Sequence, residues 1–82
     1  MTTLDITLNK ELINRNAVTL VQLLTPIKSE IYINKESRRI NAKSILGVLS
    51  ASINKGDEVI FEIFEDSEVA AVKQILQNFN EE

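Results

Sequence analysis

The sequence contains no histidine and no cysteine among its 82 residues. Without thiols the chain cannot build a disulfide framework or use thiolate chemistry, and without both residue types it lacks the usual ligands of transition metals. We therefore expect no metal site and no cofactor. The two glycines form no phosphate-binding loop, and no serine stands in a nucleophile-elbow pattern. Together these absences predict a protein that is not an enzyme.

Long apolar runs are also absent, and no stretch approaches the length needed to span a bilayer. The first residues lack the basic segment and apolar run of a targeting signal. The net charge of −3 and the 5% of aromatic residues argue against direct binding to nucleic acid. We expect a cytoplasmic protein that contacts neither a membrane nor nucleic acid.

The length predicts one small domain spanning residues 1–82. Apolar residues make up 44% of the chain and charged residues 26%, which is typical of a globular protein. The charge is unevenly distributed, because residues 1–43 carry seven basic and four acidic side chains while residues 44–82 carry two and eight. Such asymmetry can steer encounters with partners, although solvated faces of unequal sign are the simpler explanation.

Apolar residues alternate with polar ones in three segments and recur at helical spacing in three others. Residues 3–9, 30–34 and 58–64 predict strands, and a turn at 35–37 leads into a weaker strand at 38–40. A helix is predicted from Asn14 or Asn16, either of which could be its N-cap, to near Pro26. A short helix is expected over 44–50. A last helix follows a cap at Asp66 or Ser67.

This order of elements predicts an α+β protein, in which the helices cover one face of an antiparallel sheet and leave the other face open. Tyr32, Ile60 and Phe64 project away from the expected core side of their strands. They could form an apolar patch on the open face, suited to self-association or partner docking. Polar residues interrupt that patch, so scattered exposed side chains are the commoner explanation.

The segment Asn41–Ser50 reads as a polar loop, a serine at a helix start and a short amphipathic helix. It resembles the regulatory-serine helix of HPr, the histidine-containing phosphocarrier of the bacterial sugar phosphotransferase system. The resemblance runs along almost the whole chain, since Arg15, Ala17, Leu20–Gln22, Ser29 and Ile31 fall at HPr-like spacings. It implies the HPr fold, an open-faced two-layer sandwich with sheet order 1-4-2-3.

In the register of this resemblance, Ile13 occupies the position of the phosphorylated histidine, and Arg15 matches the arginine that attends it. A branched alkyl group has no lone pair to attack a phosphoryl donor and no nitrogen to carry phosphate. The resemblance therefore implies a degenerate phosphocarrier site at Ile13 and Arg15.

Ser44 corresponds to the serine that HPr kinase/phosphorylase modifies in HPr of many Gram-positive bacteria. A phosphate there would lie at a helix start, with Lys43 adjacent in sequence; the alternative is an ordinary N-cap serine. The resemblance also implies that Leu46 and Leu49, with Lys43, contact partners, whereas Ile45 and Val48 are expected in the core. A wholly buried short helix is the alternative.

A retained regulatory serine without the histidine is similar to the catabolite-repression HPr of bacilli. We therefore expect a regulatory adaptor in carbon metabolism, switched by phosphorylation of Ser44. Its implied partners are HPr kinase/phosphorylase and either a catabolite control transcription factor or phosphotransferase-system components. The alternative is an interaction or oligomerising module, such as a homodimer, that uses the HPr fold without phosphorylation.

Overall fold

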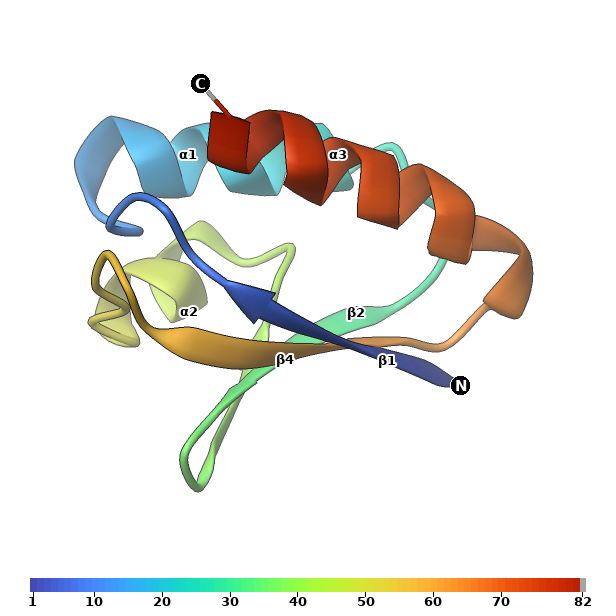
Figure 1. Cartoon of the computed structure of the whole chain (residues 1–82), viewed down its shortest axis with the longest axis horizontal. Coiled ribbons are helices and arrows are strands. Elements are labelled where there is room, and N and C mark those ends of the chain that lie inside the picture. Colours follow the sequence, from blue (N-terminus) through green and yellow to red (C-terminus); the bar gives the residue numbers. More distant parts are fainter. Residues whose placement is uncertain (82) are drawn as a thin grey trace.

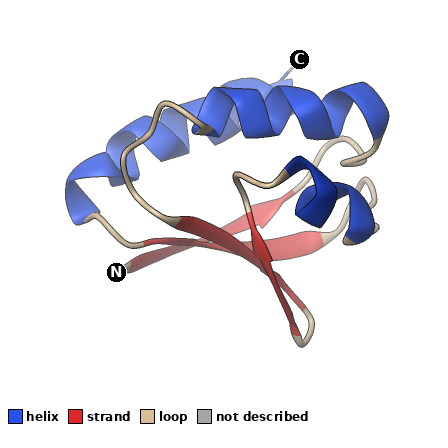
Figure 2. Ribbon diagram, turned by 180° about the vertical axis from the view of Figure 1, so that it is seen from behind, coloured by secondary structure: helices blue, strands red, loops and turns tan. Residues whose placement is uncertain are grey.

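A computed structural model describes residues 1–81 and shows two layers, a four-stranded antiparallel sheet and the helices that cover one of its faces (Figures 1 and 2). The sheet order is β1-β4-β2-β3. The strands are β1 (Thr2–Thr7), β2 (Ile31–Lys35), β3 (Arg38–Asn41) and β4 (Glu58–Ile63). The α-helices are α1 (Asn14–Leu24), α2 (Ile45–Ser50) and α3 (Val69–Glu81). The predicted fold class and sheet order are confirmed.

The alternation of apolar and polar residues gives the sheet its two faces. Phe61 of β4 is paired with Leu4 of β1 and Ile33 of β2, and these three side chains point toward the helices. The next row, Asp5–Ile60–Asn34, points to the face that carries no helix. Successive strand residues face opposite sides, so the register decides which side chains share the open face.

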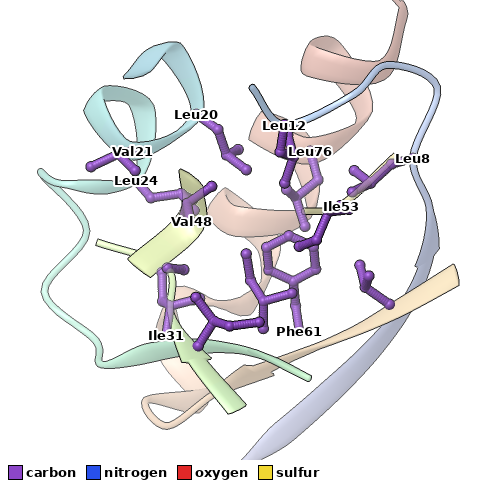
Figure 3. Packing of buried hydrophobic residues seen from close by; sticks show 14 of the residues in the cluster. Leu8, Leu12, Leu20, Val21, Leu24, Ile31, Val48, Ile53, Phe61 and Leu76 are labelled. Atoms are coloured by element: carbon purple, nitrogen blue, oxygen red, sulfur yellow. The ribbon is translucent and has the colours of Figure 1, made fainter. Parts of the chain in front are cut away.

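The core lies between the helices and the sheet, where the buried side chains converge above Phe61 (Figure 3). Leu20 and Leu24 come from α1, Val48 from α2 and Leu76 from α3. The loop residues Leu8, Leu12, Ala42 and Ile53 are also fully buried. Besides these, the core contains other buried apolar residues of strands and helices: Ala17, Val21, Ile31, Ile33, Ile40, Val59, Ile63, Val72 and Phe79.

The caps predicted for the first helix are wrong. Ile13 is the N-cap residue of α1, in extended conformation, and no side chain caps the helix. The carbonyl of Ile13 accepts from the backbone N–H groups of Asn16 and Ala17, while the side-chain amide of Asn16 donates back to the carbonyl of Glu11 at 3.0 Å. Asn16 thus stabilises the loop before α1, because its side chain reaches a carbonyl of that loop instead of the helix N–H groups.

The cap predicted for the last helix is also wrong. A 3₁₀ turn, Asp66–Glu68, precedes α3, and no side chain caps that turn. The Asp66 carboxylate instead accepts from the Thr2 hydroxyl at 2.8 Å and lies 3.4 Å from the terminal ammonium of Met1. These two contacts lower the pKa of Asp66, with the Thr2 hydrogen bond contributing most. Asp66 therefore ties the start of β1 to the start of the last helix.

Candidate interaction site around α2

The segment before α2 is held by local hydrogen bonds that its sequence supplies. The side-chain oxygen of Asn41 accepts from the N–H of Lys43 at 2.9 Å, and its carbonyl accepts from the N–H of Ser44 at 3.1 Å. Asparagine favours such turns because its side chain can replace a backbone acceptor. Between them, Ala42 is fully buried and donates its N–H to the carbonyl of Ile31 in β2. The loop is thereby fixed to the sheet and places Ser44 at the helix start.

Ser44 is the N-cap of α2, which is the alternative that the sequence left open beside phosphorylation. Its backbone is extended, and its Oγ accepts from the N–H of Gly47 at 3.0 Å. A Cβ at position 47 would stand 3.2 Å from this Oγ and 3.3 Å from the Ser44 Cβ. Gly47 therefore leaves the room in which the serine side chain folds over the first turn.

The opposite end of α2 is held by two cations of the β2–β3 hairpin. The Arg38 guanidinium donates to the carbonyl of Ser50 at 3.1 Å, and the Lys35 ammonium donates to the carbonyl of Ser52 at 3.0 Å. The last carbonyls of a helix have no partner within the helix, so cations are favourable there. Sequence reasoning missed these contacts, because nothing local to the hairpin indicates which helix end it will meet.

Lys35 also forms an ion pair with Asp57, at 2.9 Å, in the turn that follows α2. The pKa of Asp57 is lowered, first by a hydrogen bond from the backbone N–H of Asn54 and then by Lys35. The turn and the hairpin are therefore fastened to each other at the end of α2, so both ends of this short helix are fixed.

The exposed side of α2 is apolar. Leu46 is 80% exposed, and Leu49 is also at the surface, as expected, whereas Val48 is fully buried. The prediction that Ile45 belongs to the core is wrong, since this side chain is 40% exposed. Side chains on a helix lean toward its N-terminus, so the side chain of the first helical residue extends past the helix end. Three apolar side chains, Ile45, Leu46 and Leu49, thus remain exposed on one short helix.

Lys43 does not point toward Ser44. Its ammonium donates to the carbonyl of Ile27, in the chain that follows α1. This contact joins the start of α2 to the end of α1, and the lysine side chain is partly buried there. Lys43 therefore fixes the two helices relative to one another, and it reaches a phosphate or a partner only by leaving Ile27.

Ile13 and Arg15 lie at the other end of α2. The backbone N–H of Leu12 donates to the carbonyl of Ile53, just after α2, which sets the start of α1 beside this loop. Ile13 and Arg15 are both exposed, and within residues 1–81 Arg15 forms no ion pair and no side-chain hydrogen bond. The six residues of α2 span about 9 Å. The structure thus places Ser44 at one end of α2 and Ile13 with Arg15 near the other.

The backbone at the start of α1 is also unusual. Asn14 has a φ of +46°, the left-handed region that residues other than glycine, asparagine and aspartate rarely adopt. Asparagine is among the residues that tolerate this conformation best, so its occurrence directly after Ile13 fits the local geometry.

Neither a membrane-spanning helix nor a metal site is found in the part of the chain that the structure describes. Over residues 1–81, no helix combines the length and the apolar character that crossing a bilayer requires. In the same residues, no three side chains of the metal-binding types are grouped around one point.

Comparison with known proteins identifies the family. The family model described as "PTS HPr component phosphorylation site" matches residues 1–81, so the chain belongs to the HPr family. Among curated relatives, the HPr-like protein Crh of Bacillus subtilis is 29% identical over 68 residues, which are 83% of this chain and 80% of Crh. The phosphocarrier protein HPr of Treponema pallidum is 34% identical over 71 residues, covering 83% of this chain and 81% of that protein.

Solved structures of HPr and Crh have the same fold as this chain. HPr-C-His from Thermoanaerobacter tengcongensis superposes with a TM-score of 0.84 at 28% identity, covering 100% of this chain and 98% of that one. Crh of Bacillus subtilis, solved as a dimer with a swapped domain, superposes with a TM-score of 0.75 at 26% identity, covering 99% of this chain and 93% of Crh. Both proteins therefore share the whole fold with this chain.

Proposed function

We propose that this protein is a regulatory adaptor of the HPr family that has lost phosphotransfer and acts by binding other proteins through α2. One observation carries the proposal: Ser44 caps a short helix whose outer side presents Ile45, Leu46 and Leu49 to solvent. A modification at the cap thus lies within one helical turn of the apolar surface that a partner would cover. The protein acts in the cytoplasm on carbon metabolism, as its similarity to Crh suggests.

We infer the loss of phosphotransfer from the composition. HPr carries its phosphoryl group on a histidine, and this chain contains no histidine. In the proposed register Ile13 replaces that histidine, and Arg15 has no phosphate to attend. An exposed isoleucine in this place favours contact with an apolar partner group over chemistry.

Phosphorylation of Ser44 is the proposed switch, and HPr kinase/phosphorylase the proposed enzyme. The free hydroxyl accepts one hydrogen bond, from the N–H of Gly47. A phosphate offers three acceptor oxygens and a charge of about −2 at the positive end of the helix dipole. The modified residue can keep the cap and still present charge beside Leu46. A catabolite control transcription factor or a phosphotransferase-system component is the proposed reader of that charge.

The kinase step is tested by incubating the purified protein with HPr kinase/phosphorylase and ATP, with an HPr that carries the regulatory serine as positive control. Intact mass should rise by one phosphate, and peptide fragmentation should place it on Ser44. Ser44→Ala should abolish the change, while Ser50→Ala, at an exposed serine on the same helix, should not. A chain that stays unmodified beside a modified HPr contradicts the proposal.

A second candidate is an interaction or oligomerising module that needs no phosphate. The observation that favours it is the dimeric state of relatives, since Crh and an HPr from Thermoanaerobacter tengcongensis have both been solved as dimers. Under this proposal the chain forms a homodimer. Sedimentation equilibrium should then give twice the chain mass at micromolar concentration, and a partner should bind equally well with and without kinase treatment.

A further inference from the structure

The open face of the sheet carries side chains that the proposed function does not use. The strand pairing shows which side chains lie on this face, because residues paired across neighbouring strands point to the same side. One row contains Asp5, Ile60 and Asn34, and the next contains Thr3, Glu62 and Tyr32. Figures 1 and 2 show that no helix covers this side of the sheet.

One half of this face is a preorganised cluster around Arg39. The guanidinium of Arg39 lies 3.9 Å from the ring centroid of Tyr32 and 5.7 Å from that of Phe64. The two rings meet edge to face, with centroids 5.7 Å apart. Stacked and edge-on arrangements of this kind fix both the rings and the cation. The aromatic side chains predicted to share the open face therefore do form a patch.

The carboxylate of Glu62 holds the guanidinium of Arg39 in this cluster. Its carboxylate accepts from Asn34 Nδ2 at 2.7 Å and from Arg39 Nε at 3.0 Å. These contacts lower the pKa of Glu62, the Asn34 hydrogen bond most of all. Arg39 thus places a positive charge on this face, and the carboxylate of Glu62 balances that charge.

The other half of the face is acidic and hollowed. A hollow of about 430 Å³ lies over β1 and β4, lined by Asp5, Ile6, Thr7, Glu58, Val59 and Ile60. Asp5 and Glu58 are diagonal neighbours across the two strands, because Asp5 is paired with Ile60 and Glu58 with Thr7. Ile60 is 41% exposed and Phe64 38%. The carboxylates of Asp5 and Glu58 have no cation among the described residues within ion-pair distance.

We infer that this open face docks a cationic, partly apolar segment of another protein. A lysine or arginine of that segment lies in the hollow, its alkyl stem against Ile60 and its charge between Asp5 and Glu58. An apolar side chain of the same segment covers Phe64. Nucleic acids and anionic membranes carry the same sign of charge as this face and are repelled. The adaptor thereby gains a second surface, on the side of the sheet away from α2.

The spacing of the two contacts defines the segment. Ile60 lies in β4 and Phe64 directly follows that strand, four residues further along the chain, which corresponds to about 13 Å in extended backbone. An extended segment spans this distance with a cation at one position and an aromatic residue four positions further on. The probe is therefore an acetylated and amidated peptide of sequence Thr-Arg-Thr-Val-Thr-Phe-Thr, with a second peptide carrying Glu in place of Arg as its counterpart.

Binding is measured by titrating each peptide into the ¹⁵N-labelled full chain and following amide chemical shifts at low and at physiological salt. The arginine peptide should saturate and shift amides of β1 and β4 around Asp5, Ile60 and Phe64, more weakly as salt rises. The glutamate peptide should not bind. The double variant Asp5→Asn with Glu58→Gln should weaken binding about fivefold to tenfold, because it removes two exposed charges.

The matched control removes the same number of charges elsewhere. Glu11 and Glu81 are exposed and lie outside the strands, so Glu11→Gln with Glu81→Gln should leave the affinity unchanged within about twofold. Equal losses in both double variants would reduce the effect to net charge and overturn the inference. It is also overturned if the peptide shifts amides of α2, if neither peptide binds, or if the same amides shift with protein concentration alone, which would make a second copy the occupant.

Discussion

Replacing Ser44 with alanine removes the one side-chain cap of α2. The Oγ of Ser44 accepts from the N–H of Gly47 at 3.0 Å, and this N–H loses its partner in the variant. Substituting an N-cap serine with alanine typically costs about 1 kcal/mol. In a domain of this size that change lowers the melting temperature by about 4–8 °C. The helix is only six residues long, so little else within it compensates.

Thermal unfolding followed by circular dichroism, with urea unfolding in parallel, measures this difference. Ser44→Asp should be nearly neutral, since aspartate is an equally good cap and its charge suits the helix start. Ser50→Ala is the control for loss of a hydroxyl, because the Ser50 hydroxyl is exposed and only donates to the carbonyl of Gly47. An alanine variant as stable as the parent chain, or an aspartate variant as unstable as the alanine one, would refute the reasoning.

Three further predictions concern other parts of the molecule. Leu46→Ser should change the free energy of unfolding by less than about 0.5 kcal/mol, because Leu46 is 80% exposed, yet it should weaken partner binding at least about fivefold; urea unfolding and a binding titration separate the two effects. Asn80→Ala should destabilise the chain by about 1–2 kcal/mol in urea unfolding, since its side chain accepts from the N–H of Asn9 and donates to the carbonyl of Thr7 at the end of β1. Its control, Asn78→Ala, should cost less than about 0.5 kcal/mol, because the Asn78 side chain contacts only the exposed Gln74. Glu62→Gln should lose a pH-dependent part of stability: the lowered pKa of Glu62 stabilises the fold above its ordinary value of 4.5, and this contribution disappears as pH falls through the folded-state pKa. The urea midpoints of parent and variant should therefore converge on acidification, and a constant difference would contradict this.

The strands and helices could be predicted from the sequence because alternation and helical periodicity are local patterns, whereas the sheet order was implied by the resemblance to HPr. The helical spacing of Val72, Leu76 and Phe79 puts them on one face of α3, and all three are buried. The capping role of Ser44, which the sequence offered as the alternative to phosphorylation, is also local, since the hydrogen bond from Gly47 reaches only three residues along the chain. Such local features could be predicted, although the caps expected for the first and the last helix are not formed.

Contacts between distant segments could not be predicted in this way. The carboxylate of Asp66 was expected at a helix start, but the partner that draws it away, Thr2, lies at the other end of the chain. Exposure of Ile45 depends on how the start of α2 is placed against the sheet. The stacking of Arg39 on Tyr32 and Phe64 likewise depends on which strands become neighbours. The sequence therefore favoured scattered exposed side chains, whereas the structure shows an ordered cluster.

The measurement that tests the adaptor most directly is the affinity of a catabolite control transcription factor for the chain before and after kinase treatment, by titration calorimetry. The account predicts at least about tenfold tighter binding by the phosphorylated form, corresponding to about 1.4 kcal/mol. The gain should be lost in Ser44→Ala and the binding itself in Leu46→Ser. Equal affinity of both forms, with Leu46→Ser still weakening it, would contradict the phosphate switch and leave a constitutive binding surface on α2.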